Sequence, residues 1–294
     1  MLKNLSKSRK RTKRSTLKKL NCNPNVVGKS INKNSCYTRK VLNKIKTKFN
    51  KNNVGNRITS SDDQEVYKEL SLKVKNCEDE SCWLKDMDEI EKKSLHKESF
   101  SPAKPKEWIK NPNEWLSNFD ILNVLNQYEE KHQDFKFIGP SPIDFDSTPY
   151  GNNQCVSTEL CKFNLQDYND SGFKSIGVVF NLDKHNQSGS HWVSLFISIR
   201  HNLIYYFDSA ANDIPKEIDK LIKLIVSQSQ NKLKFITNVP HQHQYSNTEC
   251  GMYSLFFIIT MLDESMPIKK RINMFSKRRL NDKFIQVFRK KYFN

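Results

Sequence analysis

One cysteine and one histidine in the second half of the chain have the types and surroundings of a reactive thiol pair. Cys250 lies in TECGMYSLFF, where an apolar, helix-like run begins, and His191 lies in SHWVSLFISI. Free backbone amides and the dipole at a helix start favour a thiolate, and Gly251 lets the backbone approach a substrate closely. Taken alone, however, Cys250 fits a small buried apolar residue better.

Two further residues complete the set that a cysteine protease needs, namely a base, a group that orients it, and an oxyanion donor. Asp208 closes the segment LIYYFDS, 17 residues after His191. If the two segments pair as an antiparallel hairpin, their outer ends lie side by side and the carboxylate can orient the imidazole. Gln244 precedes Cys250 by six residues and could stabilise an oxyanion. Each residue alone also fits an ordinary strand, turn or loop position, so the prediction depends on the ordered set.

The elements around these residues predict an α+β domain, because strands cluster between helical sections. Strand patterns cover residues 175–182, 190–199, 203–209 and 232–239. Helical patterns cover residues 114–132, the segment from Pro215 to Ile225, the apolar run from Cys250, and the basic segments 268–279 and 280–293.

Composition divides the rest of the chain. Residues 1–60 hold 18 Lys or Arg and no acid, which accounts for the net charge of +17. We expect residues 1–62 to be a disordered basic tail, since they offer little to bury. Residues 63–105 carry two short helical patterns and end near Pro102 and Pro105, which predicts a helical arm before a catalytic domain over 106–294.

The order of these motifs resembles a known clan of cysteine proteases that contains adenain, the SUMO (ubiquitin-like) proteases and the polyprotein proteases of large DNA viruses, such as that of African swine fever virus. In that clan a His-Trp pair precedes an acid that closes the next strand, then a Gln, then a Cys-Gly at a helix start. The matching residues are His191, Trp192, Asp208, Gln244, Cys250 and Gly251, with Trp115 and Leu116 in the upstream segment EWLSNFDI. Asn118 departs from the acid that SUMO proteases have at its position, which puts a SUMO-type contact there in doubt.

The resemblance implies a papain-like or adenain-like domain with a central mixed sheet flanked by helices. It also implies that Trp192, Trp115 and Gly251 bind substrate and that Trp192 narrows a channel for a Gly-Gly or similarly small pair. The expected function is an endopeptidase that matures viral capsid or core polyproteins in the virion and the host cytoplasm. One alternative is an isopeptidase that removes a SUMO-like or ubiquitin-like modifier, and a second is a non-catalytic virion protein that binds nucleic acid.

Partners and cofactors follow from charge and cysteine use. Protein substrates are expected, and residues 1–60 could bind nucleic acid, act as an import signal, or only aid solubility. We expect a monomer with reduced thiols, no membrane segment and no cofactor, since the odd number of seven Cys does not suit a secreted disulfide framework. A zinc site is not expected, because none of the candidate pairs has C-x2-C spacing: Cys77 with Cys82, Cys155 with Cys161, and His241 with His243.

Overall fold

The computed structural model describes residues 17–149, 154–230 and 232–294, and they fall into two compact units. The first unit comprises residues 17–22 and Gly28–Ser99, and the second comprises Asn23–Val27 and Phe100–Asn294. None of the described helices is long and apolar enough to cross a membrane.

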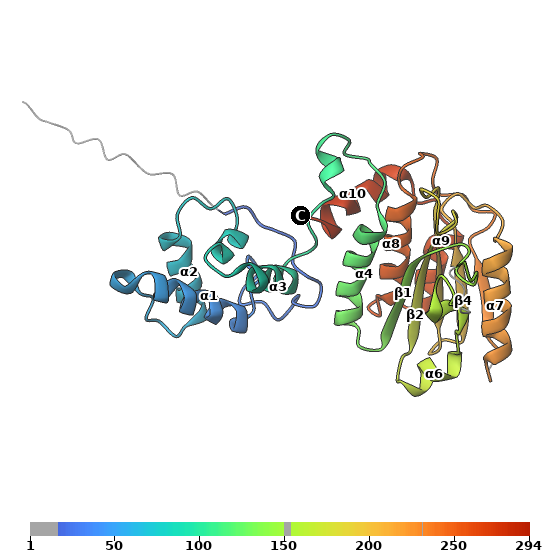
Figure 1. The fold of residues 1–294 in the computed structure, drawn as a ribbon, viewed down its shortest axis with the longest axis horizontal. Coiled ribbons are helices and arrows are strands. Elements are labelled where there is room, and N and C mark those ends of the chain that lie inside the picture. The colour runs from blue at the N-terminus through green and yellow to red at the C-terminus, as the bar shows by residue number, and fades with distance from the viewer. Residues whose placement is uncertain (1–16, 150–153, 231) are drawn as a thin grey trace, which may run out of the picture. The chain divides into compact units, whose positions relative to one another are not determined.

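The first unit is helical (Figure 1). Its elements are α1 (Arg39–Asn52), α2 (Asp63–Lys73) and α3 (Glu89–Ser99), with the short 3-10 helices η1 (Val54–Asn56) and η2 (Glu80–Leu84). Thr38 caps α1, which buries one face made by Val41, Leu42, Ile45 and Phe49. The predicted disorder over 1–62 is therefore wrong for residues 17–62, because a few apolar residues at helical spacing form a core that average composition hides. Residues 1–16 of that prediction lie outside the described residues.

Disulfides join six of the seven cysteines, all of which the structure describes: Cys22–Cys36, Cys77–Cys82 and Cys155–Cys161. Cys250 is the free one, and it is buried. The expectation of reduced thiols is therefore wrong. An odd count excludes only complete pairing, and sequence spacing does not show which sulfur atoms fold to bonding distance. The thiol count thus gives no argument about the compartment.

The second unit is built on a mixed five-stranded sheet in the order β1-β2-β3-β4-β5. The strands are β1 (Phe135–Pro142), β2 (Ser175–Asn181), β3 (Trp192–Ser198), β4 (Leu203–Phe207) and β5 (Lys234–Thr237). The inner pairs are antiparallel and the outer pairs parallel. This confirms the predicted mixed sheet and the β3–β4 hairpin. The sequence did not predict β1, because Gly139, Pro140 and Pro142 are turn signals.

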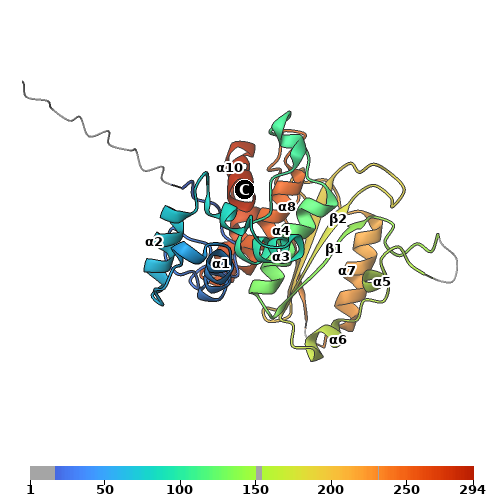
Figure 2. The same cartoon turned by 60° about the vertical axis from the view of Figure 1, so that its left-hand side comes forward.

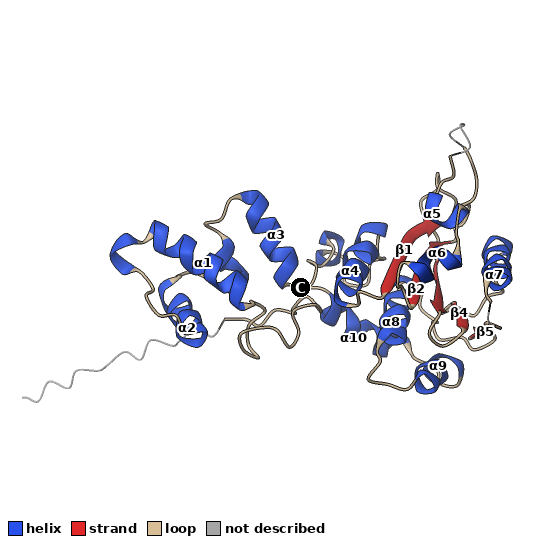
Figure 3. Ribbon diagram, turned by 90° about the horizontal axis from the view of Figure 1, so that it is seen from below, coloured by secondary structure: helices blue, strands red, loops and turns tan. Residues whose placement is uncertain are grey.

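Helices cover both faces of this sheet (Figures 1 and 2). One layer contains α4 (Asn118–Lys131), α8 (Cys250–Leu262), α9 (Ile268–Ser276) and α10 (Asp282–Tyr292), preceded by η3 (Lys106–Ile109). The other contains α5 (Thr158–Cys161), α6 (Leu165–Asp170) and α7 (Lys216–Gln228), as Figure 3 also shows. In α8 every residue except Ile259 is buried. A helix that is apolar all round belongs inside a core, so the residue at its start is held rigidly.

Candidate active site

Three polar residues lie at the ends of three core elements. His191 immediately precedes β3, Asp208 immediately follows β4, and Cys250 is the first residue of α8. Because β3 and β4 are antiparallel, the start of one lies beside the end of the other. Nε2 of His191 lies 2.6 Å from Oδ1 of Asp208, and the His191 ring is also hydrogen-bonded to the Cys250 side chain. The structure thus brings together the three residues that the sequence singled out.

The electrostatics of the histidine favour its charged form. Burial alone would lower the pKa of His191, but hydrogen bonds with Asp208 and Cys250, and the negative charges of those groups, raise it to about 10. At neutral pH the ring is therefore an imidazolium. A cation beside a sulfur favours the thiolate form in general, so a charged His191 ring is a suitable partner for Cys250. Since Nε2 faces Asp208, Nδ1 is the nitrogen left to exchange a proton with the sulfur.

Asp208 is fully buried and held from several sides. Its carboxylate accepts hydrogen bonds from the backbone N–H groups of Ala210 (2.8 Å) and Asn212 (3.1 Å). The side chain of Asn238, at the end of β5, accepts from the Asp208 N–H (3.0 Å) and donates to its carbonyl (2.7 Å). Sequence reasoning missed Asn238, because a single Asn after a strand carries no signal of what it faces. Its contacts hold the Asp208 backbone, from which the carboxylate projects.

Gln244 is buried in the loop that leads into α8, and the residue after Asp208 holds it. Ser209 Oγ donates to Gln244 Oε1 (2.7 Å), and the Ser209 carbonyl accepts from the backbone N–H groups of His243 and Gln244. Gln244 Nε2 donates to the Ser246 carbonyl (2.6 Å). Because Oε1 is occupied, the amide cannot flip without losing a bond. Ser209 is thus a second positioning residue that the sequence did not reveal, while the oxyanion role of Gln244 stays a prediction.

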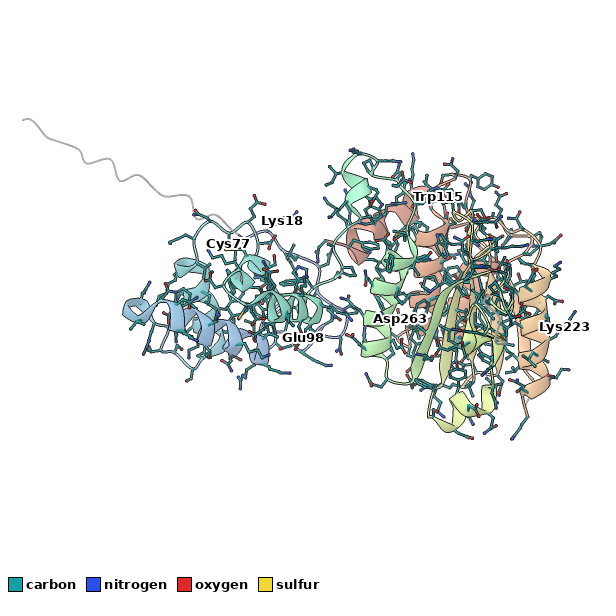
Figure 4. The ribbon with its side chains drawn as sticks, viewed as in Figure 1. Lys18, Cys77, Glu98, Trp115, Lys223 and Asp263 are labelled. Carbon is teal, nitrogen blue, oxygen red and sulfur yellow. A yellow bond between two sulfur atoms is a disulfide. The ribbon has the colours of Figure 1, made fainter. Side chains whose placement is uncertain are left out.

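The three residues predicted to bind substrate differ in exposure. Trp192 is buried, and its Nε1 donates to the Leu116 carbonyl (3.1 Å). A Cβ atom on Gly251 would lie 3.1 Å from Leu116 Cβ and 3.2 Å from Trp192 Cδ1, tighter than ordinary van der Waals contact. Trp115 lies at the surface of the second unit (Figure 4). Gly251 therefore packs tightly against Leu116 and Trp192, and direct substrate contact by the three predicted residues stays a prediction.

Comparison with known proteins places this site in a family. Residues 174–294 match the model of the Ulp1 protease family, C-terminal catalytic domain. This segment is an Ulp1-family catalytic domain. It contains His191, Asp208, Gln244 and Cys250, and it confirms the resemblance drawn from the order of the motifs.

Relatives of the Ulp1-family domain occur in large DNA viruses. A thiol protease of Acanthamoeba polyphaga mimivirus is 35% identical over 153 residues, which cover 51% of this chain and 48% of the relative. A cysteine protease of African swine fever virus is 33% identical over 160 residues, which cover 50% of this chain and 58% of the relative. The matches thus span about half the length of these curated relatives.

A solved structure confirms the fold over a longer range. The crystal structure of the African swine fever virus protease aligns with a TM-score of 0.64 and 23% identity, and the alignment covers 95% of this chain and 97% of that one. At this identity the likeness concerns the fold alone. It extends over both units, so the helical unit before the Ulp1-family domain also has a counterpart there.

Proposed function

We propose that this chain is a cysteine endopeptidase that cleaves after small residues such as a Gly-Gly pair. The observation that carries the proposal is the hydrogen-bonded series Asp208, His191, Cys250 at the start of a buried helix. The viral thiol and cysteine proteases that match half of the chain support it.

In the proposed reaction the Cys250 thiolate attacks the scissile carbonyl carbon, and a C–S bond forms as the carbonyl oxygen becomes an oxyanion. The Cys250 N–H and Gln244 stabilise this oxygen. His191 then gives its proton to the leaving amine as the C–N bond breaks. Water, deprotonated by His191, hydrolyses the thioester and restores the thiolate. Asp208 keeps the imidazole ring oriented in both its charged and its neutral form.

The narrow surroundings of the nucleophile support the preference for small residues. Leu116 and Trp192 approach Gly251 so closely that even one added methyl group is crowded. A substrate backbone that passes there needs residues without bulky side chains. We therefore expect a peptide with Gly-Gly before the cleaved bond to be cut, and the peptide with Val at the second Gly to resist.

The test compares these two peptides with wild type and with Cys250→Ala. Cleavage of the Gly-Gly peptide by wild type alone is the expected result. Equal cleavage of both peptides would contradict the proposed specificity, and normal turnover by Cys250→Ala would show that Cys250 is not the nucleophile. Circular dichroism of the variant is the control for an intact fold.

The biological role that we propose is maturation of viral capsid or core polyproteins, in the virion and the host cytoplasm. The viral origin of the relatives supports it. Mass spectrometry of candidate virion precursors, incubated with wild type and with Cys250→Ala, should show new termini after small residue pairs only with wild type. Precursors left uncut at protease concentrations that cut the peptide would argue against this role.

A second candidate function is removal of a ubiquitin-like modifier. The relatives from several African swine fever virus isolates carry the name SUMO-1 cysteine protease, and the proposed chemistry also cleaves an isopeptide bond to lysine. Two substrates with the same residues before the cleaved bond distinguish the two functions: a modifier joined to a lysine side chain, and a linear Gly-Gly peptide. The rates at which they are cleaved are compared. Faster cleavage of the branched substrate by an order of magnitude or more would favour the second candidate.

A further inference from the structure

A buried ion pair includes the residue that immediately precedes Cys250 in the chain. Glu249, the residue before Cys250, is fully buried, and Arg289 of α10 is 5% exposed. Nε of Arg289 lies 3.0 Å from one carboxylate oxygen of Glu249, and Nη2 lies 3.2 Å from the other. Buried charges of this kind need a partner, and each of these two residues supplies one for the other.

The same guanidinium binds backbone carbonyls of two separate segments. It donates to the carbonyl of Glu114 (2.8 Å), and at longer range to those of Asn113 (3.3 Å) and Thr248 (3.3 Å). It also lies 4.5 Å from the centre of the Trp108 ring. Arg289 therefore ties the segment before Trp115 to the residues that precede Cys250. Only a planar fork with five donors can satisfy so many acceptors at once.

These contacts lead directly to the proposed substrate channel. The segment bound by Arg289 continues into Leu116, whose carbonyl accepts from Trp192 and whose side chain lies against Gly251. Loss of the guanidinium would leave Trp108 Nε1 as the remaining side-chain donor to the Glu114 carbonyl and so loosen this wall of the channel. It would also leave the Glu249 carboxylate without its cation. An uncompensated buried carboxylate on the residue before Cys250 opposes formation of a thiolate. The charged groups linked to Cys250 are therefore His191, which contacts it, Asp208, which contacts His191, and the pair of Arg289 with Glu249, the residue before Cys250.

We propose that Arg289 is a positioning residue for Cys250: it cancels the charge of Glu249, the residue before Cys250, and fixes the Leu116 wall of the substrate channel. This inference rests on the proposed function, since it takes Cys250 as the nucleophile. It differs from a purely structural role in one respect. A purely structural residue would act only through the stability of the fold. Neutralising Arg289 or Glu249 should instead shift the pH at which the thiolate forms, in opposite directions for the two residues.

The test measures the rate of Cys250 alkylation by iodoacetamide against pH, with the modified peptide followed by mass spectrometry. Arg289→Met should raise the midpoint of the profile by about one pH unit. At any fixed pH below both midpoints, this corresponds to about tenfold less thiolate than in wild type. Glu249→Gln should lower the midpoint, because the buried cation of Arg289 then has no carboxylate to oppose it. The double variant Glu249→Gln with Arg289→Met should return close to wild type.

Lys290→Met is the matched control, because it removes a positive charge from an exposed position on the same helix. Its profile should not move. If Arg289→Met does not fold, Glu249→Gln and the double variant still decide the matter. Unchanged midpoints, or shifts in the same direction for both single variants, would overturn the proposal. In peptide cleavage, Arg289→Met should also raise KM, since the channel wall is loosened.

Alkylation needs no peptide substrate, so failure of this inference and failure of the proposed function can be told apart. If the alkylation midpoints of the two single variants shift in opposite directions but wild type cleaves no peptide, the proposed charge arrangement is supported and the proposed protease function is rejected. If wild type cleaves the peptide but the alkylation midpoints do not move, the protease function is supported and the proposed role of Arg289 is rejected.

Discussion

Replacing Asp208 by Asn is the sharpest test of the proposed site, because it changes charge and hydrogen bonding at nearly constant shape. The carboxylate accepts from the His191 ring at 2.6 Å and from the backbone N–H groups of Ala210 and Asn212. An amide has one acceptor oxygen, so its NH2 group must face at least one of these three donors. The fully buried position leaves no water to relieve that contact.

The expected size of the effect follows from these contacts. Loss of a hydrogen bond to a charged group costs about 1.5 to 3 kcal/mol, and a buried donor left unsatisfied costs about 1 to 3 kcal/mol. We therefore expect the free energy of unfolding to fall by about 3 to 5 kcal/mol. Loss of the orienting carboxylate should reduce kcat/KM by about three to four powers of ten, milder than the loss of Cys250 itself.

The stability change should depend on pH with a definite sign. In the folded wild type the pKa of His191 is raised to about 10, so the proton on His191 stabilises the fold fully below its unfolded pKa of about 6.5. That contribution is lost as the pH rises through 10. The difference in unfolding free energy between wild type and Asp208→Asn should therefore be largest below pH 6.5 and shrink as the pH approaches and passes 10.

The assay combines urea unfolding at several pH values with peptide cleavage, and Asp213→Asn, an exposed change in the same loop, is the control. The control should resemble wild type in both measurements. A kcat/KM for Asp208→Asn within threefold of wild type would refute the orienting role. A pH-independent loss of stability would refute the link to His191.

Other predictions address the remaining parts of the site. Gln244→Ala should lower kcat by about a hundredfold or more with little change in KM, since the lost contact forms in the transition state; an unchanged kcat would exclude it from the oxyanion site. Ser209→Ala should have the same pattern but a smaller effect, of about tenfold, and a change in KM alone would contradict its positioning role. Gly251→Ala should raise KM for the Gly-Gly peptide, because its Cβ crowds Leu116; a lower KM would argue against a narrow channel. Unreduced, denatured protein should react with one equivalent of a thiol reagent, whereas seven would show that the disulfides are absent.

Much of the catalytic unit could be predicted from sequence, because its signals are local. Alternation of apolar residues predicts β3 and β4, a short turn makes them a hairpin, and the apolar run after Cys250 predicts a buried helix. The hairpin then places His191 beside Asp208 whatever the rest of the chain does. The order of the motifs supplied the family as well.

Other features escaped prediction because they depend on pairings between distant residues. Composition averaged over residues 1–62 hid the four apolar residues that α1 buries. The partner of β1 lies 40 positions further along the chain, so that strand gains its hydrogen bonds only from the fold. The disulfides likewise depend on which sulfur atoms meet in space.

The sequence by itself determined which residue types stand at the ends of β3, β4 and α8, because the spacing of apolar residues and the turn-forming residues can be recognised within short segments. Only the tertiary structure decided how those residues are held: Asn238 and Ser209 come from other segments to orient Asp208 and Gln244, and Arg289 reaches Glu249 from a helix 40 residues away. The physical reason is that a buried polar group must find its hydrogen-bond partner wherever the packed chain provides one.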